Sequence, residues 1–409
     1  MIKNIFSRTY KIILLLLPVF FLVPAAIAFA ADLGLIADQS ASYESINDET
    51  NLTYTGILMP WFSAPLGNMG RFYLSLGFSA KYEKEAWTLT PELLETELKL
   101  RMGEGKEFRA GRLYYSDPLG FTANGLFDGV RYSQFIGAAG KLNIGAWYTG
   151  LLYKKSAHIT MTEEELDLFN EELDYSNFFT TYFAPRRLIA AVDWEHWGRS
   201  ELTRLRLSLL GQYDLSGSDE LYHSQYLIGK LTIPVKAFIF NLGGVVQLTE
   251  NDKNIQVSFA GELGIGWLLP TAVHDRLLLL GRFSAGTIND TVTAFVPITT
   301  VPQGNVLKAK LSGLSMIQAE YTVRLHQSFS LRIFGSYFIL SDMGTYQAFP
   351  DGRDGYFLGS EFYGQLVWSP FSDMQIKAGG GAFLPALGNA DKNAKALWQI
   401  DLSVVVALF

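Results

Sequence analysis

Apolar and polar residues alternate with a period of two through almost the whole chain after residue 30. Between Arg71 and Tyr82 every even-numbered residue is apolar, and most odd-numbered ones are polar or small. The same pattern recurs between Leu314 and Leu325 and between Asp373 and Leu384. A strand sorts such residues onto two faces, whereas a helix would scatter them around its axis. The pattern therefore predicts an all-β protein.

The alternating segments are long enough to cross a membrane when the strands are tilted. Most of them contain about ten or more residues. They predict a transmembrane antiparallel up-and-down β-barrel of about 18 strands, within a range of 16–18. The strands are expected near 33–43, 51–64, 69–82, 90–101, 106–115, 127–135, 140–153, 186–197, 200–213, 220–232, 235–248, 254–268, 274–286, 314–325, 328–340, 356–368, 373–384 and 396–409.

The expected connections alternate between short and longer ones along the chain. Longer or more polar connections are expected near 44–50, 83–89, 116–126, 154–185, 214–219, 249–253, 287–313, 341–355 and 385–395. Bacterial barrels have short periplasmic turns and long outer loops. This order predicts that both ends of the barrel domain lie on the periplasmic side.

The first 30 residues have the pattern of a cleaved secretory signal. Lys3, Arg8 and Lys11 precede the apolar run Ile12–Val23, and Ala28-Phe29-Ala30 is a small-x-small cleavage site. We therefore expect a signal peptide at 1–30 and one barrel domain at 31–409, located in the outer membrane. Cleavage removes three positive charges and changes the net charge from −7 to −10, so nucleic acid is not an expected partner.

Membrane lipid and the barrel-assembly machinery are expected partners, and a monomer is favoured. Trp61, Trp197, Trp267 and Trp368 are expected in a lower aromatic girdle, and Tyr82, Tyr115, Tyr153 and Trp398 in an upper one. The chain ends in Phe409, and a terminal aromatic residue resembles the C-terminal signal of outer-membrane proteins. Phe409 falls in the polar phase of the last strand, so a bulge is expected nearby.

Charged residues in the strands are expected to face the lumen, because a charge facing lipid costs about 2–4 kcal/mol at the midplane. The predicted pore-lining bases are Arg71, Lys81, Lys99, Arg101, Arg109, Arg131, Arg204, Arg206, Arg276, Arg282, Arg324, Arg332 and Lys377. The predicted acids are Glu97, Asp193, Glu195, Glu320 and Glu361, together with Asp401. Either this lumen attracts anions, or its Arg–Glu pairs brace the wall. The residues alone leave both interpretations open.

One helix is expected outside the signal, over Thr160–Leu173. Thr162 can cap it, and Leu166, Phe169 and Leu173 form an apolar stripe. Either it narrows the pore mouth or it lies on the surface.

The favoured function is an outer-membrane channel that passes polar, anionic solutes or a polysaccharide. Alternatives are a binding or adhesion barrel with a plugged lumen, a fatty-acid-type transporter, and an outer-membrane hydrolase. The chain has no cysteine and its five histidines are scattered, so we expect no cofactor, no metal site and no catalytic residue.

Two stretches resemble the alginate-export type of outer-membrane protein. The first is Gly111-Arg112-Leu113 followed by Phe127-Asp128-Gly129-Val130-Arg131, and the second runs from Ser360-Glu361-Phe362 through Trp368-Ser369-Pro370 to Lys377–Pro385. The resemblance implies a monomeric barrel of about eighteen strands, whose members in some cases pass an anionic polysaccharide through a basic lumen. This chain differs in having acids among its lumen bases.

Overall fold

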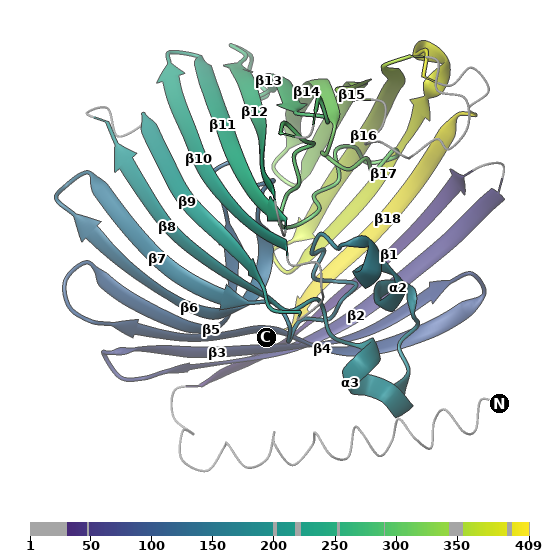
Figure 1. Ribbon diagram of the computed structural model, residues 1–409. Helices are drawn as coiled ribbons and strands as arrows, with labels where there is room; N and C mark the ends of the chain where they lie inside the picture. The colour runs from purple at the N-terminus through teal and green to yellow at the C-terminus, as the bar shows by residue number, and fades with distance from the viewer. Residues whose placement is uncertain are drawn as a thin grey trace.

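The computed structural model describes residues 31–46, 49–198, 203–216, 222–251, 254–289, 291–342, 355–390 and 395–408. The described residues form eighteen strands, shown in Figure 1. The strands are β1 (Asp32–Ile46), β2 (Glu49–Pro65), β3 (Gly70–Glu83), β4 (Ala86–Arg101), β5 (Lys106–Ser116), β6 (Asn124–Ile136), β7 (Gly140–Tyr148), β8 (Arg187–Trp197), β9 (Arg204–Asp214), β10 (Tyr222–Val235), β11 (Phe238–Asn251), β12 (Asn254–Leu268), β13 (Arg276–Ser284), β14 (Leu314–His326), β15 (Phe329–Leu340), β16 (Phe357–Phe371), β17 (Met374–Leu384) and β18 (Leu397–Leu408).

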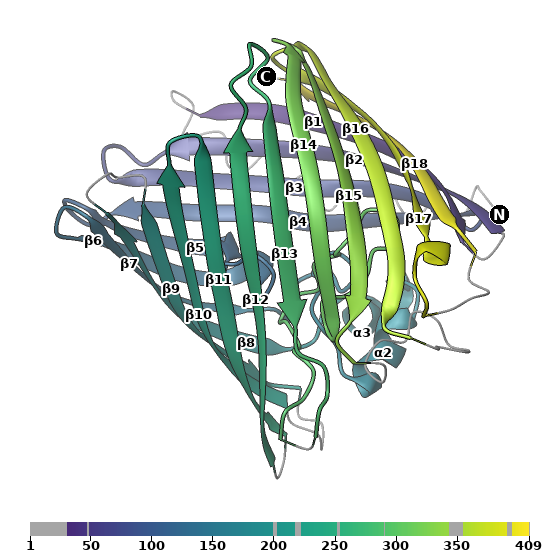
Figure 2. The same ribbon diagram turned by 90° about the horizontal axis from the view of Figure 1, so that it is seen from above.

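The strands close into one antiparallel barrel. Each strand pairs with its neighbours in the chain, and β1 pairs with both β2 and β18. Figures 1 and 2 show the resulting ring of tilted strands from two directions. Closure leaves no free first or last strand, which is the condition for a β-structure to span lipid. The predicted fold class is confirmed.

The chain ends and the connections divide between the two ends of the barrel. β1 begins and β18 ends at the end that carries the turns after β2, β4 and β6, here called the short-turn end. The two longest connections, 149–186 and 285–313, lie at the opposite, long-loop end. Three of the connections predicted to be longer or more polar are short: β2 begins three residues after β1 ends, β12 begins three residues after β11 ends, and only Lys84 and Glu85 join β3 to β4. Both of these residues have positive φ, as a two-residue hairpin requires.

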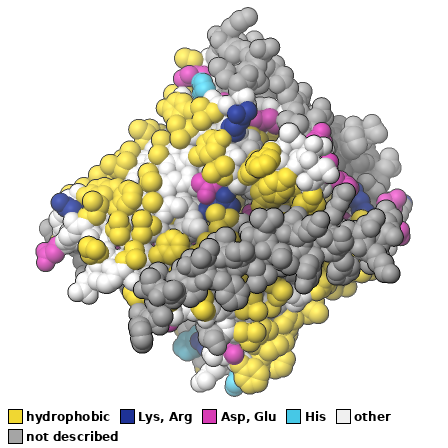
Figure 3. Space-filling view, turned by 90° about the horizontal axis from the view of Figure 1, so that it is seen from below, with side chains coloured by type: hydrophobic (Ala, Val, Ile, Leu, Met, Phe, Trp, Pro, Cys, Tyr) yellow, Lys and Arg dark blue, Asp and Glu magenta, His cyan; other side chains and the backbone are white. Residues whose placement is uncertain are grey.

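The outer face of the wall is apolar. Leu209, Leu227, Val246 and Phe259 are register partners on successive strands, and all four are exposed. The adjacent residue Leu210, on the other face of β9, is buried. Figure 3 shows broad hydrophobic patches on the visible face, with few described charged side chains among them. An apolar exterior around a closed barrel is suited to lipid.

Three loops from the long-loop end pack against the inner wall. Phe121, Ile159 and Phe295 come from loops 117–123, 149–186 and 285–313, and they join one buried cluster with residues of β5 to β12. Backbone bonds connect these loops, because Thr160 N–H donates to the Ile298 carbonyl and Ile298 N–H donates to the Thr122 carbonyl. The lumen is therefore partly filled by chain along this side.

A second cluster fastens loop 285–313 to the opposite part of the wall. Val306 and Ala309 pack against residues of β14 to β17. The carboxylate of Glu361 accepts hydrogen bonds from the backbone N–H groups of Asn305, Val306 and Leu307, at 2.7, 3.1 and 2.9 Å. Glu361 is fully buried, so it anchors this loop to β16.

The predicted helix is present as α2 (Glu163–Asn170), and two shorter turns follow it, η1 (Tyr175–Asn177) and α3 (Phe178–Thr181). Thr162 caps α2 in a capping box with Glu165. The Glu165 carboxylate also contacts Arg187 at 2.6 Å, and Arg187 binds Asp214 at 2.5 Å. Arg187 is fully buried and ties the helix to β8 and β9. No helix in the described ranges is both long and apolar enough to cross a membrane.

Two members of the predicted upper girdle lie elsewhere. Tyr115 and Tyr153 are buried, because Tyr115 packs against Trp147 and Tyr153 against Tyr182. The loops that fill the lumen create an interior for them that strand alternation does not reveal. The predicted signal peptide and the predicted bulge at Phe409 lie outside the described residues.

Arg187→Gln should destabilise the barrel and release α2. It leaves two carboxylates near one another without their shared cation, and breaking such a buried pair costs about 3–5 kcal/mol. Urea unfolding in detergent should show a lower midpoint, and protease should cut within 160–175 faster. Arg186→Gln removes an exposed neighbouring arginine and serves as the control. Equal behaviour of the two variants would contradict the anchoring role.

Candidate functional site

Four of the predicted bases stand side by side on neighbouring strands. Arg71 of β3 is the register partner of Lys99 on β4. Lys99 in turn pairs with Arg109 on β5, and Arg109 pairs with Arg131 on β6. Arg71 lies at the short-turn end of β3, whereas Arg131 lies near the middle of β6. Because barrel strands tilt, this row climbs along the pore axis as it passes from strand to strand.

A second row begins four strands later. Lys141 of β7 pairs in register with Glu195 on β8. Glu195 pairs with Arg206 on β9, and Arg206 pairs with Lys230 on β10. Lys230 contacts Glu262 at 2.7 Å. Lys141, Lys230 and Glu262 are not among the predicted residues, although each is a charged residue within an alternating segment and could have been found by that signal.

Two of the predicted acids, Glu97 and Glu320, each contact a pair of bases. Glu97 contacts Arg71 at 3.6 Å and Arg109 at 2.9 Å. Glu107, which sequence analysis did not select, contacts Lys99 at 2.9 Å and Arg109 at 2.5 Å. These contacts hold β3, β4 and β5 together across the inner face and neutralise part of the first row.

The other acids in the strands differ in their partners. Glu320 lies between Arg276, at 3.4 Å, and Arg332. Glu195 is paired with Arg204, and the missed Glu262 accepts from the predicted Arg282 at 2.9 Å. Asp401 accepts a hydrogen bond from Tyr363 at 2.8 Å. The bracing interpretation therefore describes Glu97, Glu195 and Glu320, whereas Asp193 and Asp401 accept from tyrosine hydroxyls and Glu361 from backbone N–H groups.

Several predicted bases have no carboxylate partner within the part of the chain that the structure describes. Arg206 donates to the Pro118 carbonyl and Arg324 to the Gln327 carbonyl, the latter at 2.8 Å. Lys81, in contrast, contacts Glu83 at 2.5 Å near the long-loop end. The unpaired set among the described residues is Arg101, Arg131, Arg206, Arg324 and Lys377.

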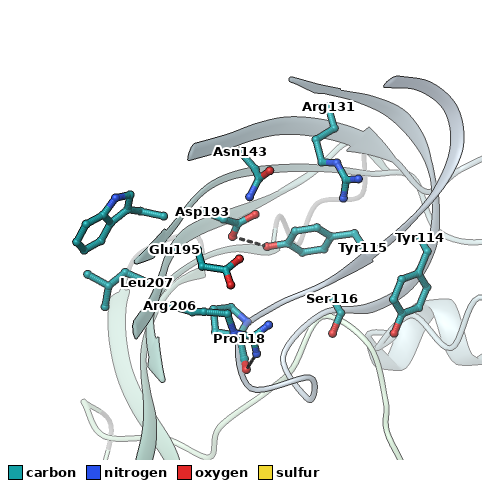
Figure 4. Close-up of a pocket in the computed structure, with 11 residues that line it drawn as sticks. Tyr114, Tyr115, Ser116, Pro118, Arg131, Asn143, Asp193, Glu195, Arg206 and Leu207 are labelled. Atoms are coloured by element: carbon teal, nitrogen blue, oxygen red, sulfur yellow. Dashed lines mark hydrogen bonds between the residues drawn. The ribbon is translucent and has the colours of Figure 1, made fainter. Parts of the chain in front are cut away.

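Arg131 and Arg206 meet at one cavity on the inner side of β5 to β9. The cavity has a volume of about 230 Å³, and its polar lining comes from the side chains of Tyr115, Arg131, Asn143, Asp193, Glu195 and Arg206. Figure 4 shows these side chains converging from several strands. Tyr115 donates a hydrogen bond to Asp193 at 3.2 Å, which occupies one oxygen of that acid. Arg131 Nε is buried without a hydrogen-bond partner among the described residues.

The loop 117–123 forms one wall of this cavity. The buried carboxylate of Asp117 accepts from four backbone N–H groups, those of Leu119, Gly120, Thr122 and Ala123, at 2.7–3.1 Å. These bonds fold the loop tightly and bring the Pro118 carbonyl to Arg206. The sequence predicts this segment only as a loop, because the fold sets the neighbours of Asp117.

The site offers guanidinium and amide donors to a small ligand. Arg presents a planar fork that matches a carboxylate, and Asn143 and Tyr115 add neutral polar groups. No group of three or more His, Asp or Glu within the described ranges is arranged to hold a metal ion. The cavity therefore combines the cationic donors Arg131 and Arg206 with the carboxylates Asp193 and Glu195.

Solved structures with the same fold come from Pseudomonas aeruginosa. OccK2 (OpdF) superposes with a TM-score of 0.64 at 12% identity, covering 92% of this chain and 97% of its own. OccK5 (OpdH) superposes with a TM-score of 0.62 at 9% identity, covering 94% of this chain and 99% of its own. The outer membrane protein OprD superposes with a TM-score of 0.57 at 13% identity, covering 92% of this chain and 93% of its own. No family model matches the sequence, and no curated protein matches it. At this identity the likeness shows the fold, that of an outer-membrane β-barrel, and the predicted outer-membrane location is confirmed with it.

The expected resemblance to alginate-export proteins is wrong. The similar structures are OccK, OccD and OprD barrels. The residues that suggested the resemblance have structural roles here. Arg112 makes a two-point contact with Asp128, at 2.9 and 2.7 Å, and Phe127 is buried in the core. A motif that braces adjacent strands can recur in barrels that differ in cargo.

Glu97→Gln should make the channel more selective for anions. It removes a carboxylate that neutralises Arg71 and Arg109, so we expect the anion-to-cation permeability ratio to rise by about twofold. Reversal potentials in a salt gradient across a planar bilayer measure this ratio. Glu83→Gln is the control, because both partners of its pair are largely exposed and contribute little. A fall in the ratio for Glu97→Gln would contradict the assignment.

Proposed function

We propose that this chain is a passive outer-membrane channel for small anionic solutes, with a carboxylate-bearing molecule of about one ring as the preferred class. The observation that carries the proposal is Arg131. Its guanidinium has no carboxylate partner among the described residues and lines a polar cavity at the inner end of a row of bases.

The rows of bases provide a path to that cavity. An anion that enters at the short-turn end meets Arg71 first and then successive cations along the tilted row. Acids at Glu97 and Glu107 moderate the attraction, so binding at each step stays weak enough for release. Conduction requires this balance between entry and exit.

The size of the space favours a small molecule over a polysaccharide. A cavity of about 230 Å³ is smaller than the range of about 300–1,000 Å³ typical for drug-sized ligands. The loops 117–123, 149–186 and 285–313 pack inside the barrel and leave less room for a polymer.

Two of the structural neighbours support a carboxylate. OccK2 was crystallised in complex with glucuronate, and OpdK with vanillate. Both ligands carry one carboxylate on a six-membered ring. The forked donors of Arg131 and Arg206 would suit the same group in this chain.

Arg131→Gln should weaken carboxylate binding. The loss of a charge-assisted hydrogen bond, about 1.5–3 kcal/mol, corresponds to a rise in the half-saturating concentration of about tenfold or more. The measurement is transport of glucuronate or benzoate into liposomes that contain the purified barrel, with single-channel conductance in chloride recorded in parallel.

Arg324→Gln is the matched control, since Arg324 also lacks a carboxylate partner in the described ranges but lies at the short-turn end, outside the cavity. It should leave the half-saturating concentration unchanged. Bilayers that stay silent after confirmed insertion would overturn the channel itself. Equal effects of the two substitutions would overturn the role of the cavity.

A further inference from the structure

The barrel wall contains a seam between β4 and β5. β4 pairs with β3 from Ala86 to Leu100, but its described rungs with β5 are confined to Leu98–Arg101. The strands part at Gly111, whose φ is +127° and where a Cβ would lie 2.2 Å from the Thr96 carbonyl oxygen. Beyond this point, Arg112 N–H donates to the Thr96 hydroxyl at 2.8 Å in place of a backbone carbonyl.

The open edge of β4 is satisfied by side chains. Carbonyls at alternate positions of a strand point to the same side, and those of Leu89, Pro91 and Leu93 accept from Tyr175 Oη, Tyr182 Oη and Arg112 Nη1. Pro91 has no N–H to offer a neighbouring strand, and proline in a sheet is typical of an edge. Unsatisfied backbone groups are costly in lipid, so these side-chain donors make the seam compatible with a membrane.

A part of the 149–186 loop fills the seam, and we call residues 151–156 and 175–184 the plug. Two backbone bonds of 2.9 Å, from Lys154 N–H to Tyr182 O and from Ala184 N–H to Leu152 O, join its two halves. The Ser156 hydroxyl donates to Glu92 of β4 at 2.5 Å.

The plug is rich in aromatic rings. Phe178 stacks on Tyr182 at 4.5 Å between ring centroids, and Tyr153 lies 4.9 Å from Tyr182. Phe179 is 82% exposed, and Trp87 on the outward phase of β4 is 60% exposed. The rings thus extend from buried Tyr153 and Tyr182 to freely accessible Phe179, which provides stacking surfaces for another planar ring.

The seam is closed by side chains and not by a continuous backbone ladder. The plug is joined to β4 by the hydroxyls of Tyr175, Tyr182 and Ser156, and its Leu151 carbonyl accepts from Arg112 Nη2 of β5 at 2.9 Å. Burial raises the pKa of the Tyr182 hydroxyl, which therefore remains a donor. Side chains can turn away and return without unfolding a strand.

We propose that this seam is a lateral portal, through which small planar aromatic molecules pass between the lumen and the outer leaflet when the plug moves aside. The aromatic plug supplies the stacking path, and the side-chain bonds supply the reversible closure. The portal is independent of the proposed anion specificity, because it requires only an open lumen.

The test uses naphthalenemethanol, a neutral aromatic alcohol that partitions into lipid. The full barrel is inserted into planar bilayers containing the probe, and the rate of current interruptions is recorded in chloride. In a Glu92→Cys/Ser156→Cys variant, a short reducible thiol cross-linker ties the plug to β4, and the absence of native cysteine makes the linkage specific. We expect cross-linking to lower the interruption rate by about fivefold or more, and reduction to restore it. Unblocked conductance should stay the same.

Tyr175→Phe/Tyr182→Phe tests the closure from the opposite direction. Removal of both hydroxyls should raise the interruption rate by about tenfold, since each lost bond contributes on the order of a few-fold. Tyr337→Phe is the matched control, because its hydroxyl also donates to a loop carbonyl, that of Leu387, away from the seam. An interruption rate that is the same in the cross-linked and reduced states, or the absence of interruptions in the unlinked protein, would overturn the portal. Chloride conductance that persists in either case would leave the channel function standing.

Discussion

The structure depends on closure of the backbone hydrogen-bond ladder. In lipid, each exposed N–H and C=O without a partner is costly, so a β-structure that spans the membrane must return to its first strand. Here β1 bonds to β2 on one side and to β18 on the other, with Leu35 opposite Pro60 and Leu408. The apolar exterior and the polar interior follow, because successive side chains on each closed strand alternate between lipid and lumen.

The β4–β5 junction shows how the same constraint can be met in a second way. The strands separate beyond Leu98, and the carbonyls of β4 are satisfied by tyrosine and arginine side chains. The carbonyls still accept hydrogen bonds, but their donors are side chains and not the backbone of a neighbouring strand. The wall thereby acquires a segment that is closed by side chains, and the proposed portal lies there.

Charge inside the barrel has two roles, which lie at different positions. Where an acid stands between two bases, as at Glu97 and Glu320, the group holds strands together and its field is largely cancelled. Arg131 lies in register with the braced Arg109 but borders a cavity with Asn143 and Tyr115. The two interpretations of the basic lumen are therefore compatible, since each describes a different part of it.

The sequence by itself determined the barrel and its approximate strand number. Period-two alternation is a local property, and a charge on the lipid face is too costly to be common. The helix over Glu163–Asn170 was also predictable, from its Thr162 cap and acidic first turn. Only the tertiary structure decided which arginines are free, because the partners of Arg109 and Arg187 come from other strands and loops. It also decided that Glu361 anchors a loop, that Tyr115 faces inward and that β4 parts from β5. Each of these depends on contacts between residues far apart in the chain, and a local pattern carries no information about them.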